Sequence, residues 1–137
     1  MDAPQTTLTQ LDVERLGKIL ARAEASYFAT GIRLLREKMA RSPAIPAEQV
    51  PPTLVTMNSI VSYVDERTGK QSEVVMAYPN DTDPARGRVS ILSPVCASLL
   101  GLHVGQSVDY PMPDGQTARL RVVGIEYQPE KAGDLHL

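Results

Sequence analysis

The sequence predicts an α+β fold in which a short antiparallel helical hairpin precedes an antiparallel sheet that carries one short helix. Apolar residues recur with helical spacing over residues 9–41, prolines interrupt residues 43–52, and short β-prone runs separated by turn residues fill residues 53–127. The 137 residues suffice for one domain with a small appendage.

The expected hairpin begins near Thr9, which forms a weak capping box with Asp12. Apolar residues then recur on one face of each of two helices: Leu16, Ile19, Leu20 and Ala23, then Phe28, Ile32, Leu35 and Met39. Ser26, Thr30 and Gly31 interrupt the pattern and predict a turn between the helices. About fifteen residues per helix correspond to roughly 22 Å. Helices that short are marginal alone, so we expect them to pack on each other and on the body.

The second helix carries four basic residues, which we expect on its surface: Arg33, Arg36, Lys38 and Arg41. They form either a solvated face or a contact surface for an acidic protein or a nucleic acid backbone. The sequence leaves both interpretations open.

A proline-rich segment, residues 46–52, is the expected linker between a helical hairpin at residues 1–45 and a C-terminal domain at residues 53–137. Strands are expected within that domain over residues 60–64, 73–78, 89–92, 107–110 and 117–127. The short helix spans residues 95–100, because Ser93 can cap it, Pro94 suits its first turn and Gly101 can end it. The run Pro113-Asp114-Gly115 predicts the last hairpin.

Motifs for catalysis or metal binding are missing from the sequence. A single cysteine, Cys96, excludes an intramolecular disulfide and a multi-cysteine zinc site, and no phosphate-cradling glycine motif occurs. His103 and His136 have no partners at ligand spacing. The net charge of −2 gives no overall attraction to nucleic acid or membrane, and no signal peptide or membrane helix is evident. We expect a cytoplasmic protein with no catalytic residue, metal, cofactor or small-molecule substrate.

Several motifs of the C-terminal domain occur together: Ser93-Pro94, a small helix ending at Gly101, a hairpin at residues 113–115, and a final strand with Val122, Ile125 and Tyr127. This set resembles the C-terminal domain of the bacterial Gre transcript-cleavage factors. A closer resemblance is to their shorter relatives, the regulators of nucleoside diphosphate kinase. It rests on VTMNS at residues 55–59 and EYQPEKAGD at residues 126–134, and it covers essentially residues 50–137.

The resemblance implies an FKBP-like C-terminal domain behind a short coiled-coil hairpin. It also implies binding to core RNA polymerase at the rim of the secondary channel. Gre factors pass a long hairpin down that channel and place a pair of tip carboxylates at the catalytic magnesium. Here the expected hairpin is too short to do so, and its tip, residues 24–31, holds one carboxylate, Glu24, which could not hold a second metal.

The docking patch implied by the resemblance consists of Leu92, Ser93 and Pro94. Gre factors carry an acidic or amide residue before Ser-Pro, whereas this chain carries Leu92. Ser93 and Pro94 can equally be a helix start and nothing more. An FKBP-like fold also suggests prolyl isomerase activity, but a chain with one Phe and no Trp lacks the aromatic cage of such pockets.

These observations favour a non-enzymatic regulator of transcription that docks at the secondary-channel rim of RNA polymerase and competes with Gre-type factors without stimulating RNA cleavage. One alternative is a truncated transcript-cleavage or elongation factor, which would need tip carboxylates. Another is an interaction module that regulates nucleotide metabolism, as the name of the shorter relatives suggests. Weak or indirect contact with DNA or RNA stays open.

Overall fold

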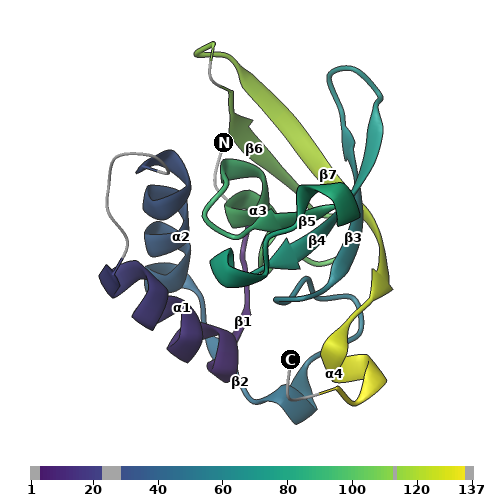
Figure 1. The fold of residues 1–137 in the computed structure, drawn as a ribbon. Helices are drawn as coiled ribbons and strands as arrows, with labels where there is room; N and C mark the ends of the chain where they lie inside the picture. The colour runs from purple at the N-terminus through teal and green to yellow at the C-terminus, as the bar shows by residue number, and fades with distance from the viewer. Residues whose placement is uncertain (1–3, 23–28, 113, 135–137) are drawn as a thin grey trace.

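The computed structural model describes residues 4–22, 29–112 and 114–134, and its centre is a sheet in the order β5-β4-β3-β7-β6 (Figure 1). The strands are β3 (Ile60–Asp65), β4 (Gln71–Ala77), β5 (Arg88–Ser90), β6 (Ser107–Pro111) and β7 (Thr117–Tyr127). All neighbouring pairs are antiparallel except β4 and β5, which are parallel. The predicted antiparallel sheet therefore has one exception. It arises because η2 (Pro79–Asp81) and η3 (Pro84–Arg86) lead the chain back before β5 begins.

The C-terminal part of the chain contains two helices. The helix α3 (Pro94–Leu99) matches the expected short helix within one residue at each end. A second, α4 (Pro129–Ala132), follows β7 and was not predicted. Four residues are too few to show helical periodicity, although the Gln128 side chain accepts a hydrogen bond from the Lys131 N–H as a helix cap.

The N-terminal helices are α1 (Gln10–Arg22) and α2 (Ala29–Arg41). In Figure 1, α2 stands beside α3, and α1 passes below α2 instead of running along it. Consistently, α2 packs more extensively against α3 than against α1. Leu16 of α1 and Leu35 of α2 belong to the same buried apolar cluster as Met76 and Val122 of the sheet. The α+β prediction is thus confirmed, and the helices share one core with the sheet.

Gly31 lies inside α2 and not in the turn where the sequence placed it. A Cβ atom at this position would lie 1.7 Å from the backbone oxygen of Leu92. The absence of a side chain therefore lets α2 approach the segment that leads into α3. Spacing along one helix could not reveal this contact, because the partner is far away in the sequence.

The proline-rich segment is held to both ends of the chain. The strands β1 (Leu8–Thr9) and β2 (Ala44–Ile45) form a small parallel pair, and η1 (Ala47–Gln49) follows. The Gln128 side-chain amide donates to the carbonyl oxygens of Pro51 and Leu54 at 2.9 and 2.7 Å. These bonds fix the entry to the C-terminal region against α4.

Candidate docking surface

The predicted docking residues lie where α2 meets the start of α3. The Ser93 hydroxyl accepts a hydrogen bond from the Cys96 N–H at 3.3 Å, and Pro94 occupies the first turn of α3, as the sequence predicted. Leu92 is only 7% exposed and packs in the core, while Ser93 and Pro94 are partly buried. Their role in docking stays a prediction, and their role in starting α3 is confirmed.

Lys38 is not on the surface, so its place on an exposed basic face is a wrong prediction. Its side chain is buried, and its Nζ donates to the carbonyl oxygens of Ala97, Ser98 and Leu100 at 2.6–2.7 Å. The last carbonyls of a helix have no partner within the helix, and a lysine can satisfy them. Burial, with a smaller contribution from Arg41, lowers the pKa of Lys38 well below its ordinary value. One signal was available, because Lys38 lies three residues after Leu35 and thus near the apolar stripe.

The other basic residues of α2 are exposed but have different partners. Arg33 pairs with Glu37 one turn later at 3.4 Å, and Arg36 donates to the Leu20 carbonyl at the end of α1 at 3.0 Å. Arg41 is exposed at the end of α2. The four basic residues therefore do not form one continuous basic face. Glu24, the expected tip residue, lies outside the described residues.

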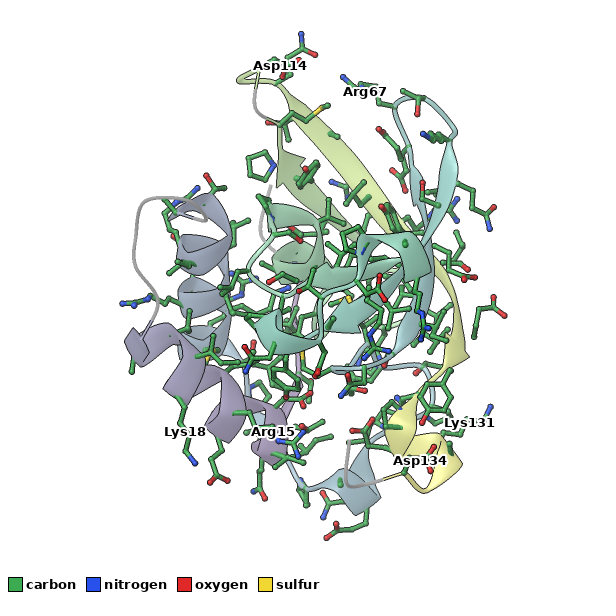
Figure 2. All side chains as sticks on the ribbon, in the orientation of Figure 1. Arg15, Lys18, Arg67, Asp114, Lys131 and Asp134 are labelled. Carbon is green, nitrogen blue, oxygen red and sulfur yellow. The ribbon has the colours of Figure 1, made fainter. Side chains whose placement is uncertain are left out.

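A groove of about 660 Å³ lies between α1 and the loop that follows β4. It is lined by side chains from three segments: Arg15, Lys18 and Ile19 of α1, residues 78–81 of the loop, and Leu92 before α3. Figure 2 shows Arg15 and Lys18 on α1. The sequence did not predict this groove, since its walls come from segments far apart in the chain. It contains one residue of the predicted docking patch, Leu92.

Asp12 forms a partly buried polar contact with Tyr78, which itself lines the groove. The Tyr78 hydroxyl donates to Asp12 Oδ1 at 3.2 Å, and the Arg15 guanidinium lies 5.7 Å from the centre of the Tyr78 ring. Asp12 Oδ2 accepts the Met57 N–H at 3.1 Å. Burial, with a smaller contribution from the nearby Glu130 charge, raises the pKa of Asp12 to about 6. Thr9 caps α1 as predicted, by accepting the Asp12 N–H at 2.9 Å, while the Asp12 carboxylate bonds to the body.

The segment VTMNS, residues 55–59, joins the two ends of the chain. Met57 binds Asp12 of α1 through its N–H, and the Thr56 hydroxyl donates to Glu130 of α4 at 2.6 Å. These contacts give a structural reason for two motifs on which the resemblance rests. They also explain why the Glu130 charge raises the pKa of Asp12, since both carboxylates approach one turn.

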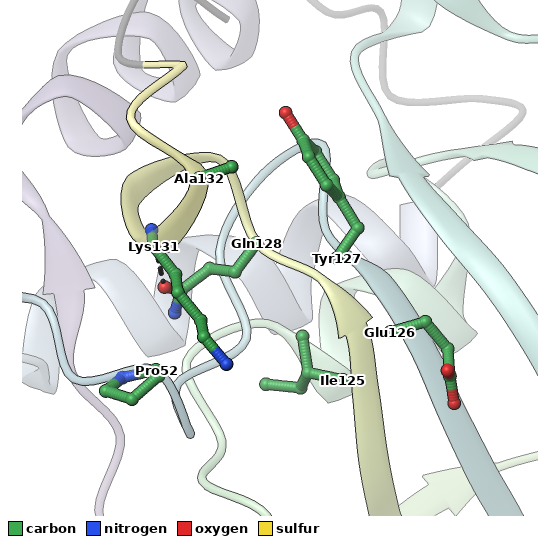
Figure 3. Close-up of a pocket in the computed structure, with 7 residues that line it drawn as sticks. All are labelled: Pro52, Ile125, Glu126, Tyr127, Gln128, Lys131 and Ala132. Atoms are coloured by element: carbon green, nitrogen blue, oxygen red, sulfur yellow. Dashed lines mark hydrogen bonds between the residues drawn. The ribbon is translucent and has the colours of Figure 1, made fainter.

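A smaller pocket of about 240 Å³ lies between the end of β7 and α4 (Figure 3). Its wall includes Gln128, whose amide is engaged by the bonds to Pro51 and Leu54. Tyr127 donates a hydrogen bond to Asp134, and this bond raises the pKa of the Tyr127 hydroxyl to about 12. These side chains hold α4 in place. The polar groups in the pocket are therefore accounted for by the packing of the C-terminal segment.

Chemistry beyond binding has little support in the described part of the chain. No group of three or more His, Cys, Asp or Glu side chains among those residues could hold a metal ion. Burial raises the pKa of the Cys96 thiol to about 11, which disfavours the reactive thiolate. No helix in the same residues combines the length and apolar character needed to cross a membrane.

Comparisons with known proteins agree with this architecture. The family described as "Transcription elongation factor, GreA/GreB, C-term" matches residues 50–127. The chain is 33% identical to the regulator of nucleoside diphosphate kinase of Escherichia coli K12, over 98% of each chain. It is 28% identical to transcription elongation factor GreA of Thermodesulfovibrio yellowstonii, covering 79% of this chain and 68% of that one.

A solved structure gives the same result. The prokaryotic transcription elongation factor GreA/GreB from Nitrosomonas europaea superposes with a TM-score of 0.71 at 35% identity, covering 90% of this chain and 99% of that one. Both expectations from the resemblance, the fold class and the relationship to short Gre-type proteins, are therefore confirmed. The chain belongs to the GreA/GreB family of transcription elongation factors.

Proposed function

We propose that this chain is a cytoplasmic, non-enzymatic regulator that binds core RNA polymerase at the rim of the secondary channel and competes there with Gre-type factors without stimulating RNA cleavage. The observation that carries the proposal is the combination of a matched GreA/GreB C-terminal region with very short N-terminal helices. Docking would come from the body, and nothing in the chain would reach the catalytic centre.

The helices are too short for the tip to reach the catalytic centre. Their length therefore favours a protein that occupies the channel rim over one that delivers carboxylates into the channel. Each of α1 and α2 has 13 residues, and at 1.5 Å per residue each is about 20 Å long. Both helices also pack on the body, through Asp12 and Lys38. A hairpin bound to its own domain in this way cannot extend like a free arm into a channel.

The sequence of the hairpin tip supports the proposal that this protein does not stimulate RNA cleavage. Residues 24–31 contain one carboxylate, Glu24. Holding a second metal at the polymerase centre would need a pair of acidic side chains. A protein that docks like a Gre factor without this pair would block the site for factors that carry it.

The test is a competition assay on core RNA polymerase, in which a labelled Gre factor is displaced by this protein while RNA cleavage in stalled complexes is followed. We expect displacement together with loss of cleavage. Pro94→Ala should weaken displacement if the docking patch is used. Pro84→Ala is the matched control, because Pro84 also begins a short helix but is exposed in the loop before β5.

Other outcomes would contradict the proposal in different ways. Displacement with cleavage retained would favour the truncated cleavage factor. No displacement at micromolar concentration would exclude the proposal and favour an interaction module that regulates nucleotide metabolism. The name of the Escherichia coli relative, at 33% identity over 98% of the chain, is the observation behind that second candidate.

A further inference from the structure

We propose that the groove between α1 and the loop after β4 receives an apolar side chain from an acidic segment of the polymerase. This inference rests on the proposed function, because it names the part of the surface that the partner would fill and the chemistry of that partner. The groove is called the α1 groove below, and it is lined by Arg15, Lys18, Ile19, residues 78–81 and Leu92.

The floor of the α1 groove is apolar and already in position. Ile19, Tyr78 and Pro79 are partly buried, and Leu92 is 7% exposed at the edge of the core. Gly31 packs directly against the backbone of Leu92, so α2 supports this floor from behind. A preformed apolar hollow with polar walls is suited to an apolar side chain, because little ordering is needed on binding.

The α1 wall of the groove is cationic. Figure 2 shows Arg15 and Lys18 next to each other on α1. Arg15 lies over the Tyr78 ring and forms no ion pair with a carboxylate among the residues that the structure describes. Lys18 is paired with Glu14 at 3.7 Å, but both side chains are largely exposed, so this pair is weak. A partner with an acidic residue next to its apolar one would complement this wall.

A protein segment fits the groove better than a nucleic acid does. Binding to a nucleic acid depends on neutralising many phosphates at once. Here the α1 wall offers only two cations and the floor is apolar, which suits one carboxylate beside an apolar side chain better than a row of phosphates. An acidic protein segment could instead turn its carboxylate towards α1 and place its apolar side chain over Leu92.

The position of the groove connects it to the docking patch. Leu92 belongs both to the groove and to the triplet Leu92, Ser93 and Pro94. A partner bound over Ser93 and Pro94 would therefore also lie at the mouth of the groove. The two surfaces can act as one interface without any rearrangement of the chain.

The experiment measures binding of the labelled full-length protein to core RNA polymerase. We expect Arg15→Glu and Lys18→Glu each to weaken binding about tenfold or more, because each places a like charge opposite the acidic partner. Lys70→Glu is the matched control, since Lys70 is exposed in the turn between β3 and β4 and outside the groove. Thermal denaturation of each variant checks that it is folded. Lys18→Glu also spares the contact between Arg15 and Tyr78.

A photo-crosslinker placed at Asn80, an exposed residue of the groove, identifies the partner segment. We expect capture of a polymerase peptide with an Asp or Glu beside an apolar residue. Capture of RNA or DNA would overturn the inference. If the wild type binds polymerase and both groove variants bind as well as Lys70→Glu, the groove inference fails while the proposed function stands. If the wild type does not bind polymerase, the proposed function fails and the inference falls with it.

Discussion

The two N-terminal helices are attached to the body in different ways. The helix α2 is held by Lys38, whose Nζ–H donors all meet backbone carbonyls of α3 and the residue after it, and by Gly31, which packs against Leu92. The helix α1 is held by Asp12, a buried carboxylate with two donors and a second carboxylate, Glu130, close by. Burial favours the neutral form of both groups, but the Lys38 ammonium meets three acceptors, whereas the Asp12 carboxylate has a like charge nearby.

The difference teaches that a buried charge stabilises a contact only when hydrogen-bond partners surround it and no like charge lies nearby. An ammonium group has three donors, and Lys38 finds three acceptors. The Asp12 carboxylate also has two donors, the Met57 N–H and the Tyr78 hydroxyl, but its site adds a like charge, Glu130. Because burial disfavours ionisation there, the pKa of Asp12 rises to about 6, close to neutral pH. The attachment of α1 should therefore respond to pH near neutrality.

The largest effect is expected from Lys38→Met, which keeps most of the unbranched apolar side chain and removes the donors. Three carbonyl oxygens would be left without their partner in a buried position. We expect the free energy of unfolding to fall by about 3 kcal/mol or more. Chemical denaturation measures this loss. Arg33→Met on the exposed side of α2 is the control and should change stability by no more than about 0.5 kcal/mol. Equal losses for both variants would mean that the buried contacts of Lys38 contribute no more to stability than an exposed position of the same helix.

The next effect is the pH dependence of stability, tested with Asp12→Asn. The pKa of Asp12 is raised from 3.8 to about 6 on folding. A raised folded pKa means that its stabilisation is fully present below about pH 4 and is lost as the pH rises through about 6. The wild type should lose on the order of 2–3 kcal/mol across this window, and Asp12→Asn should not.

The measurement is urea denaturation of the wild type and the variant at several values between pH 4 and pH 7.5. The difference between the two profiles isolates Asp12 from the other acids. Glu14→Gln, on the exposed face of the same helix, is the control and should leave the shape of the profile unchanged. Glu130→Gln should move the transition to lower pH, because Glu130 raises the pKa of Asp12. Parallel profiles for wild type and Asp12→Asn would contradict this account.

The smallest expected effect compares the same substitution in both helices. Gly31→Ala should destabilise the protein by about 1–3 kcal/mol, because the new Cβ meets the Leu92 backbone and α2 must shift. Gly17→Ala in α1 meets nothing within 4 Å and should stabilise by about 0.5–1 kcal/mol through helix propensity. Thermal unfolding of the two variants shows which of them is destabilised and which is stabilised. A stabilising Gly31→Ala would mean that α2 does not depend on close contact with Leu92.

Local patterns in the sequence were enough to predict most elements of the fold. The last strand was expected at residues 117–127 and is β7 (Thr117–Tyr127), and the cap of α3 by Ser93 and Pro94 is as expected. These features are decided within a few residues, by alternation along a strand, by proline geometry and by side-chain capping. The motifs also indicated the family, because their order and spacing are visible without the fold.

The tertiary structure alone decided how the charged residues are used. Lys38 was expected on the surface because lysine is rarely buried, yet its acceptors lie 59 to 62 residues further along the chain. Asp12 finds the Met57 N–H 45 residues away, and the α1 groove needs three distant segments to form. A pattern along the chain records the spacing of residues but not the partner that each will meet. The hydrogen-bond partners of a buried charged residue are therefore decided only when the helices and strands pack together.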